Sequence, residues 1–258
     1  MSQWLTILQK EILEMWRNFK WIWFPLSFVL LGASEPITTY YMPTILDSFG
    51  DLPEGAVIEL PTPAPAEILF QSISQYNTLG ILIIVLASMG IIAAERKSGV
   101  AELILVKPVS YTSYILAKWF GALLLVLVSY LVGLFTSWYY VMILFEQIPF
   151  TDVLGAYGLF ALWLTVVLTI TIFFNAMFKS PGVVGFISLA CVIILNLITS
   201  TFSHWLEWSP AQLPSYTSSY LISGKLAHEA VGAISISALV IFILLGLSIF
   251  IFKNKEMA

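Results

Sequence analysis

Residues 95–110 read ERKSGVAELILVKPVS, a stretch that carries five charges in sixteen residues and lies between two long apolar runs. The rest of the chain is far less polar: hydrophobic residues make up 59% of it and charged residues 10%, whereas soluble domains average about 25% charged residues. The mean hydropathy is +0.94. This composition predicts an integral membrane protein in which residues 95–110 form a polar loop.

The apolar runs predict the number of membrane crossings. A bilayer core about 30 Å thick is crossed by about 20 apolar residues in a helix. Six nearly uncharged runs approach or exceed this length, at residues 21–41, 77–94, 119–145, 153–178, 183–202 and 231–252. The first run is not expected to be a cleaved signal peptide, because a polar, sided helix precedes it and no small-residue cleavage site follows. The predicted fold is therefore an all-α polytopic membrane protein, one domain over residues 1–258 with six transmembrane helices.

Lysine and arginine set the predicted orientation, since positively charged loops stay in the cytoplasm. Ten of the eleven basic residues fall on one side of the six runs: Lys10, Arg17, Lys20, Arg96, Lys97, Lys107, Lys118, Lys179, Lys253 and Lys255. Only Lys225 falls on the other side. Both termini and the 95–110 loop are therefore expected in the cytoplasm.

Three further segments have a recognisable character. Residues 3–19 place apolar side chains at helical spacing on one face, which predicts a helix lying in the cytoplasmic membrane interface or packed on a partner protein. Residues 43–75 contain PTPAPAE and are expected to form an extended external loop. Residues 203–229 are too polar to span but rich in the aromatic residues of membrane interfaces.

The polar stretch itself has two interpretations. Pro108 follows a small apolar patch, Leu103 to Val106, which is typical of a short cytoplasmic helix that a proline ends. Such a helix, with charges at its rim and apolar anchors, suits docking on another subunit. The alternative is a basic loop that only fixes the membrane topology.

The order of residues in this stretch resembles a known family. Glu95-Arg-Lys-Ser-Gly99, then Glu102-Leu-Ile-Leu, Lys107-Pro108-Val-Ser110 and Lys118-Trp119 are similar to the loop after the second span of ABC-2 type permeases, the membrane subunits of a class of ATP-binding cassette transporters. The resemblance extends to the interfacial N-terminal helix, the six spans and the long loop after the first span. It also implies that residues 203–229 form an external re-entrant segment.

The resemblance implies partners and roles. The short helix of the loop would dock on a separate ABC ATPase, with Glu95, Arg96, Gly99, Glu102, Leu103, Lys107 and Pro108 as coupling residues. Two ATPase copies would pair with two permease copies, identical or related, in a bacterial cell membrane. ATP and Mg²⁺ would bind the ATPase, and this chain would bind no cofactor and no nucleic acid.

The residues agree with a non-catalytic chain. A nucleotide-binding loop needs a glycine-rich turn ending in Gly-Lys and then Ser or Thr, but the only Gly-Lys pair here, Gly224-Lys225, is followed by Leu226. His204 and His228 are far apart without a nearby cluster, so no metal site is expected. The single cysteine, Cys191, lies in an apolar run and is interpreted as a small core residue.

Polar residues inside the runs are candidates for a transport pathway: Glu35, Thr165, Thr169, Asn175, Asn196 and Thr199. A carboxylate such as Glu35 is expected to face the bundle or a wet cavity, because burial in lipid is unfavourable. Its alternative place is the outer end of a shortened, proline-kinked span. The threonines and asparagines line a path or tie helices together.

Two other functions stay open at this stage. A membrane immunity or regulatory protein that binds its target without transport has the same topology. An ion-coupled secondary transporter is less favoured, because such proteins use several ionisable groups at the membrane midplane.

Overall fold

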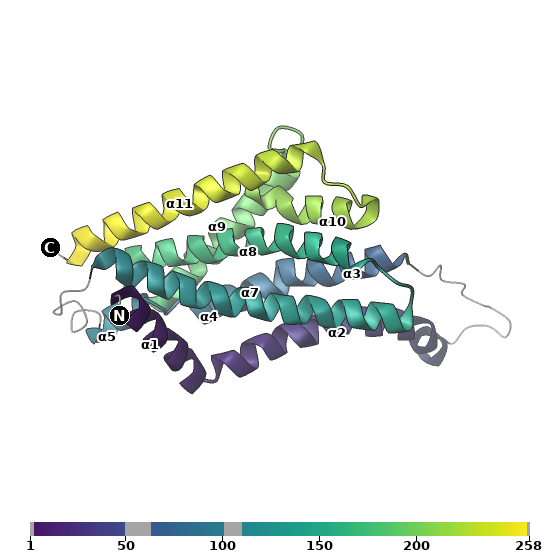
Figure 1. Cartoon of the computed structure of the whole chain (residues 1–258), viewed down its shortest axis with the longest axis horizontal. Coiled ribbons are helices and arrows are strands. Elements are labelled where there is room, and N and C mark those ends of the chain that lie inside the picture. The colour runs from purple at the N-terminus through teal and green to yellow at the C-terminus, as the bar shows by residue number, and fades with distance from the viewer. Residues whose placement is uncertain (1–2, 50–62, 101–109, 257–258) are drawn as a thin grey trace.

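The computed structural model describes residues 3–49, 63–100 and 110–256 of the chain. These residues form an elongated bundle of helices, and no β-strand occurs among them (Figure 1). Both termini and the short helix α5 lie at one end of the bundle, and α3 and α10 lie at the other. The all-helical prediction is confirmed for the described ranges.

The described ranges contain a series of helices and helical turns. In chain order they are α1 (Gln3–Arg17), α2 (Lys20–Phe49), α3 (Pro65–Gln75), the π-helix η1 (Tyr76–Gly80), α4 (Ile81–Ser88), α5 (Ala93–Ser98), α7 (Tyr111–Leu144), α8 (Phe150–Met177), α9 (Pro181–Thr201), the 3₁₀ turn η2 (Pro210–Gln212), α10 (Leu213–Ser223) and α11 (His228–Glu256).

Five helical segments in the described part of the chain are long and apolar enough to cross a membrane. They are Pro65–Ser98, Tyr111–Leu144, Phe150–Met177, Pro181–Thr201 and His228–Lys255. The first predicted span lies in α2, which has the necessary length but is not among the five. Its apolar character is diluted by Glu35 and by three prolines within the helix.

Two helix boundaries correct the prediction of an extended loop over residues 43–75. Helix α2 continues through Pro43 to Phe49, and α3 begins at Pro65. Proline is favourable in the first turn of a helix, because its missing N–H would have no helical partner there. Helix α3 therefore begins within the sequence PTPAPAE, at Pro65, and this sequence is not a loop over its whole length.

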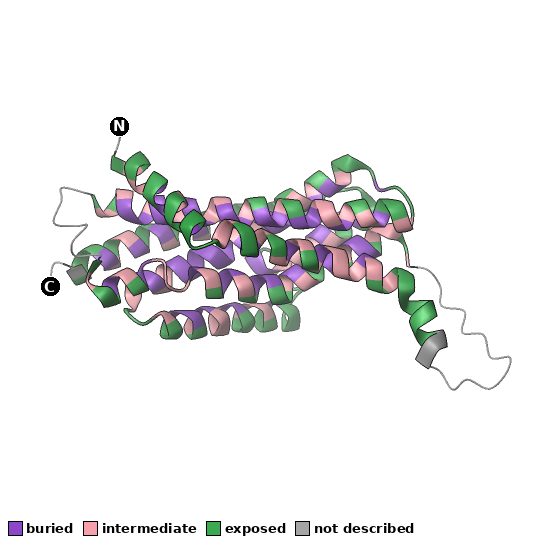
Figure 2. Ribbon diagram, turned by 90° about the horizontal axis from the view of Figure 1, so that it is seen from below, coloured by how far each residue is buried: buried purple, intermediate pink, exposed green. Residues whose placement is uncertain are grey.

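Helix α8 forms the centre of the bundle and is the most buried of the five candidate spans. It packs against α4, α7, α9, α10 and α11. Buried residues follow the inner faces of the helices, whereas exposed residues gather on the outer faces (Figure 2). Helices α9 and α11 remain mostly uncovered along their lengths.

The backbones of α2 and α7 approach closely at Gly32 and Gly133. A Cβ atom added to Gly133 would stand 2.7 Å from the carbonyl oxygen of Phe28, which is too close for any side chain. The hydroxyl of Tyr76, at the start of η1, fills the same crossing and donates to the Phe28 carbonyl at 3.0 Å. Small residues at such a crossing let membrane helices pack backbone to backbone.

Candidate functional site

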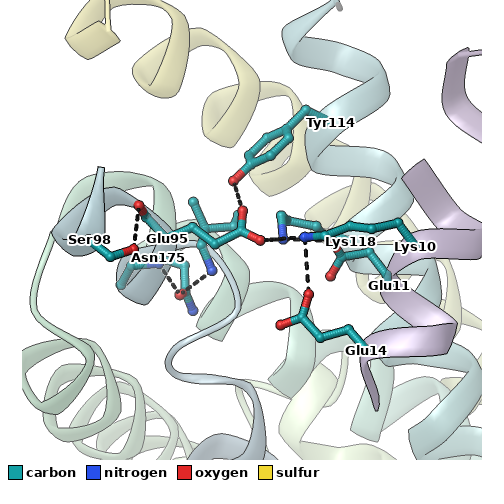
Figure 3. Close-up of polar contacts among 10 residues, drawn as sticks. Lys10, Glu11, Glu14, Glu95, Ser98, Tyr114, Lys118 and Asn175 are labelled. Carbon is teal, nitrogen blue, oxygen red and sulfur yellow. Dashed lines mark hydrogen bonds and ion pairs between the residues drawn. The ribbon is translucent and has the colours of Figure 1, made fainter. Parts of the chain in front are cut away.

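An ionic cluster joins the N-terminal helix to the beginning of the 95–110 loop. Lys118 Nζ on α7 lies 2.8 Å from Glu11 Oε1 on α1 and 2.9 Å from Glu95 Oε1 on α5. Lys10 Nζ on α1 lies 2.7 Å from the same Glu95 oxygen and 3.0 Å from Glu14 Oε2. Figure 3 shows these side chains converging from three helices. The cluster, defined here as Lys10, Glu11, Glu14, Glu95 and Lys118, therefore fixes α5 to α1 and α7.

Lys118 and Glu11, at the centre of the cluster, are buried enough for their charges to need one another. The side chain of Lys118 is 1% exposed and that of Glu11 is 9% exposed. Removing one partner from a buried ion pair leaves an uncompensated charge, which is strongly destabilising. The arrangement therefore holds the three helices in one relative position.

Lys10 stays charged within this cluster. Burial lowers the pKa of Lys10, but the hydrogen bond to Glu95 and the negative charges of Glu11 and Glu95 outweigh that effect and hold the pKa above its usual value. A raised lysine pKa contributes stability that is complete below the usual value of about 10.4 and is lost only as pH rises through the raised value. The Lys10 contacts are therefore expected to persist throughout the physiological pH range.

The three carboxylates of the cluster also have the spacing of a cation site, since Glu11, Glu14 and Glu95 offer oxygens within 4.8 Å of one another. The ammonium group of Lys10 already contacts all three, and that of Lys118 contacts two. A divalent ion at this place would meet two positive charges. The donor set consequently does not fit a metal, and it acts as an ion-pair network.

Tyr114 extends the network to the last helix. Its hydroxyl donates to Glu95 Oε2 at 2.5 Å, and its ring stacks on Phe252 of α11 with centroids 5.3 Å apart. Lys118 Nζ lies 5.1 Å from the centre of the Tyr114 ring. Glu95 is thus held from α1, α7 and, through Tyr114, α11.

Arg96, the next residue of α5, contacts the end of α8. Its guanidinium donates to the carbonyl of Ala176 at 2.9 Å and lies 5.5 Å from the centre of the Phe252 ring. Lys255 of α11 donates to the neighbouring carbonyl of Met177 at 2.6 Å. The last carbonyls of a helix lack helical partners and carry partial negative charge, so they are favourable places for cations.

The predicted coupling residues divide into two groups. Glu102, Leu103, Lys107 and Pro108 lie outside the described residues. Glu95 and Arg96 direct their side chains into the chain's own helices, while Lys97 and Ser98 are exposed. Gly99 follows α5 with φ of 77°, the left-handed conformation that ends a helix and favours glycine. A direct contact of Glu95 and Arg96 with an ATPase stays a prediction, and in this structure both residues anchor the base of the loop.

Among the predicted pathway residues, two meet in a pocket. Asn196 and Thr199 of α9 line a pocket of about 570 Å³ together with residues of η1, α4, η2 and α10. The pocket wall includes Asn77, whose Oδ1 accepts a hydrogen bond from Trp163 Nε1 of α8 at 2.8 Å. All of the residues that line it are uncharged.

The other four predicted pathway residues lie elsewhere. Thr165 and Thr169 donate to backbone carbonyls one turn earlier in α8. Asn175 is fully buried and bonds to the region between α4 and α5. Glu35 is half-buried and accepts a hydrogen bond from Gln75 Nε2 of α3 at 2.5 Å.

Sequence reasoning did not single out Glu11, Tyr114 or Asn77, and it treated Lys118 as a topology-setting charge within the family pattern. One signal for the ion pair was present. Glu11 lies on the same helical face as Leu8 and Met15, the buried residues of α1, and a charge on such a face requires a partner. The identity of that partner, 107 residues away in the chain, depends on the tertiary fold.

Comparisons with known proteins cover nearly the whole chain. Residues 5–257 match the family model described as ABC-2 family transporter protein. The chain is also similar to an uncharacterized transmembrane protein of Bacillus subtilis (strain 168), YxlG, with 32% identity over 252 residues that cover 98% of each protein. The similarity therefore includes the helices that build the ionic cluster as well as the loop itself.

Proposed function

Since this chain belongs to the ABC-2 family of transporter membrane proteins, we propose that it is the permease subunit of an exporter whose ATP is hydrolysed by a separate ABC ATPase. The proposed assembly contains two permease copies and two ATPase subunits in a bacterial cell membrane. Each permease would cross the membrane six times, with α2 as the first span and with both termini in the cytoplasm. ATP and Mg²⁺ would bind the ATPase subunits.

The observation that supports coupling is the attachment of α5. This helix forms the base of the 95–110 loop, and Glu95 and Arg96 connect it to α1, α7 and α8. A displacement of the loop by a bound ATPase would therefore reach three helices through short polar contacts, of which those of Lys118 and Arg96 are buried. An unattached loop that only fixed topology would have no need of this arrangement.

The location of the termini supports the proposed topology. The N-terminal helix α1, the end of α11 and the base of the loop lie at the same end of the bundle (Figure 1). Lysine and arginine gather in the segments at this end, which favours the cytoplasmic side. Leu5 and Trp16 of α1 are exposed next to its buried face, as expected for a helix lying in the membrane interface.

The pocket supports a route for an amphipathic cargo. Its lining combines apolar side chains with the amides of Asn77, Asn196 and Gln212 and several hydroxyl groups. Such a lining hydrogen-bonds an uncharged polar group and covers an apolar body, whereas a bare ion would lack a charged partner. We propose that cargo passes this pocket on its way to the outer end of the bundle.

Co-purification tests the proposal directly. The full-length chain, tagged and expressed with its own genomic neighbours, is expected to carry a protein with a nucleotide-binding loop through purification in mild detergent. The double variant Glu102→Arg with Leu103→Asp should remove that ATPase and leave membrane insertion intact, because the change reverses one charge and buries another in the proposed docking surface.

The matched control is Lys225→Glu, a charge reversal between α10 and α11, at the end of the bundle away from α5. This variant should still co-purify with the ATPase. A full complement of ATPase on the double variant would contradict the docking assignment. Absence of any ATPase from the unmodified chain would favour a membrane protein that binds its target without transport.

A further inference from the structure

The second apolar segment is interrupted near the base of the loop. Helix α4 ends at Ser88 and α5 begins at Ala93, with residues 89–92 in turns. Regular helical hydrogen bonds resume at the Ala94 and Arg96 amides, which donate to the carbonyls of Gly90 and Ile92. An interruption inside a membrane segment is tolerated only where other groups satisfy the freed backbone.

A single side chain forms hydrogen bonds with several backbone groups at this interruption. Asn175 Oδ1 on α8 accepts from the amides of Ile92 and Ala93 at 3.2 and 3.1 Å. Its Nδ2 donates to the Ser88 carbonyl at 3.2 Å and to the Thr171 carbonyl of its own helix at 2.9 Å. All four hydrogen-bonding positions of the amide are used. Asn175 therefore joins the end of α4 and the beginning of α5 to α8. Figure 3 shows Asn175 beside Glu95 and Ser98 of α5.

Besides the hydrogen bonds of Asn175, helix α5 contacts α8 and α11 through Arg96. Arg96 caps the Ala176 carbonyl at the end of α8 and lies over Phe252 of α11. Lys255 of α11 caps the adjacent Met177 carbonyl. The short helix is thus attached to the ends of α8 and α11, and its link to α4 passes through four residues in turns.

Gly90, within the interruption, is not required by packing. A Cβ atom added there would meet Ala94 and Pro181 at 3.6 and 3.9 Å, which are ordinary contacts. Its remaining contribution is the larger backbone freedom of glycine. A residue of this kind is suited to a segment whose backbone changes conformation.

We propose that residues 89–92 are a joint and that Asn175 is its positioning residue, so that α5 turns together with the parts of α1, α7, α8 and α11 to which it is attached, relative to the part of α4 that precedes Ser88. The inference rests on the proposed function in one respect, namely that an ATPase supplies the displacement. The joint directs that displacement to α8, the central helix of the bundle, while α4 and the pocket wall that it forms keep their place until α8 moves.

Hydrogen exchange on the full-length chain in lipid nanodiscs, without any ATPase, tests the clip. Asn175→Leu keeps the size of the side chain but removes both acceptor and donor, so peptides covering residues 89–94 should exchange about tenfold faster. Asn196→Leu is the matched control, because Asn196 Nδ2 donates to Val192 of its own helix. Unchanged exchange at residues 89–94 in a folded Asn175→Leu protein would overturn the clip.

A second variant covers the case in which Asn175→Leu does not fold. Gly90→Ala fits the available space and restricts the backbone, so exchange at residues 89–94 should slow about threefold. Unchanged or faster exchange in this folded variant would overturn the joint.

Spin labels test the direction of movement. In a Cys191→Ala background, one label pair joins Ser98 to Leu79 across the joint, and another joins Ser98 to Lys179 beyond the end of α8. In the co-purified complex, trapping the ATPase with ATP and vanadate should shift the first distance and leave the second within its original distribution. A shift confined to the second pair would overturn the inference. If no ATPase co-purifies, the proposed function fails, while the exchange experiments still decide whether the joint exists.

Discussion

Lys118 Nζ and Glu11 Oε1 lie 2.8 Å apart, although 107 residues separate them in the chain and both side chains are buried. The pair connects the N-terminal helix α1 to α7 at the base of the 95–110 loop. Glu95 of α5 shares the same lysine at 2.9 Å. The base of the 95–110 loop is therefore held by a charge on a different helix, α7.

Lys118→Met is expected to lower the free energy of unfolding by about 3–5 kcal/mol, because it leaves Glu11 and Glu95 with one ammonium group fewer. Thermal unfolding in detergent, followed by size-exclusion chromatography, measures the loss. Adding Glu11→Leu should recover part of it, since the second change removes a buried carboxylate that has lost its buried partner and keeps only Lys10. Lys179→Met, at an exposed site, is the control and should have no effect. Equal stability of both lysine variants would show that the buried pair does not hold the helices.

Gly133→Ala is expected to destabilise the crossing of α2 and α7 by about 1–3 kcal/mol or more, since the new methyl group would overlap the Phe28 carbonyl and the Tyr76 hydroxyl. Gly158→Ala is the matched control on α8, because a Cβ atom there meets nothing within 4 Å. The midpoint of thermal unfolding should fall for the first variant only. A similar small change in both would mean that helix propensity, not the crossing, sets the result.

Glu35→Gln and Glu35→Leu separate a transport role from a structural one. Glutamine retains an acceptor for Gln75 Nε2, whereas leucine leaves that amide without its carboxylate partner and is expected to cost about 1–3 kcal/mol. If the charge of Glu35 serves the pathway, Glu35→Gln should reduce export while unfolding stays near the wild-type value. Normal export by Glu35→Gln, together with higher stability of Glu35→Leu, would assign the residue to structure alone.

Asn77→Leu should lower both the stability of the fold and the affinity for cargo, because Asn77 lines the pocket and its Oδ1 accepts a hydrogen bond from Trp163 Nε1. We expect a loss of about 1–3 kcal/mol from the unpaired, buried indole N–H and a lower apparent affinity for cargo. Asn77→Leu combined with Trp163→Phe removes both partners, so it should restore stability in part while the affinity stays low. Cargo affinity is measured through the cargo-stimulated ATPase rate of the purified complex. Full recovery of affinity in the double variant would argue against contact between Asn77 and cargo.

The proposed homodimer is tested by single cysteines in a Cys191→Ala background. Ile194, Leu197 and Ile198 on α9 and Leu30 and Tyr40 on α2 are exposed in the single chain, so each is available to a second copy. Cross-links between identical chains should recur at helical period along one face. Crosslinks only to a different permease, or none at any position, would contradict the homodimer.

The sequence predicted the long helices well, because the length and uniformity of an apolar run depend only on the bilayer. The runs at 119–145, 153–178, 183–202 and 231–252 correspond to α7, α8, α9 and α11. These helices begin two to eight residues before the runs; α7, α8 and α9 end one residue short of them, and α11 ends four residues beyond. The failures occurred at prolines. Pro43 is accommodated within α2 and Pro65 starts α3, and the choice between breaking and starting a helix depends on neighbouring contacts that composition does not contain.

The site was less predictable than the helices. Asn175 was recognised as a polar residue within a span. Its function as a clip depends on a second helix, because it requires α4 to end beside Asn175. Glu95 and Arg96 were recognised as charged loop residues, yet their neighbours lie on α1, α7, α8 and α11. A sequence shows that such groups need partners, whereas only packing decides which partners they receive.

The π-helix η1 has a consequence for how relatives of this chain can diverge. A π turn contains about one residue more than an α turn, and one residue corresponds to a rotation of about 100° in a helix. Tyr76 and Asn77 in η1 contact α2 and α8, while Ser88, further along, meets Asn175. Loss of a single residue from Tyr76–Gly80 would produce a smoother helix in which these two sets of contacts cannot form together. Insertions and deletions at η1 should therefore be selected against more strongly than substitutions there, and a one-residue gap at this place in an alignment would separate proteins with different helix registers.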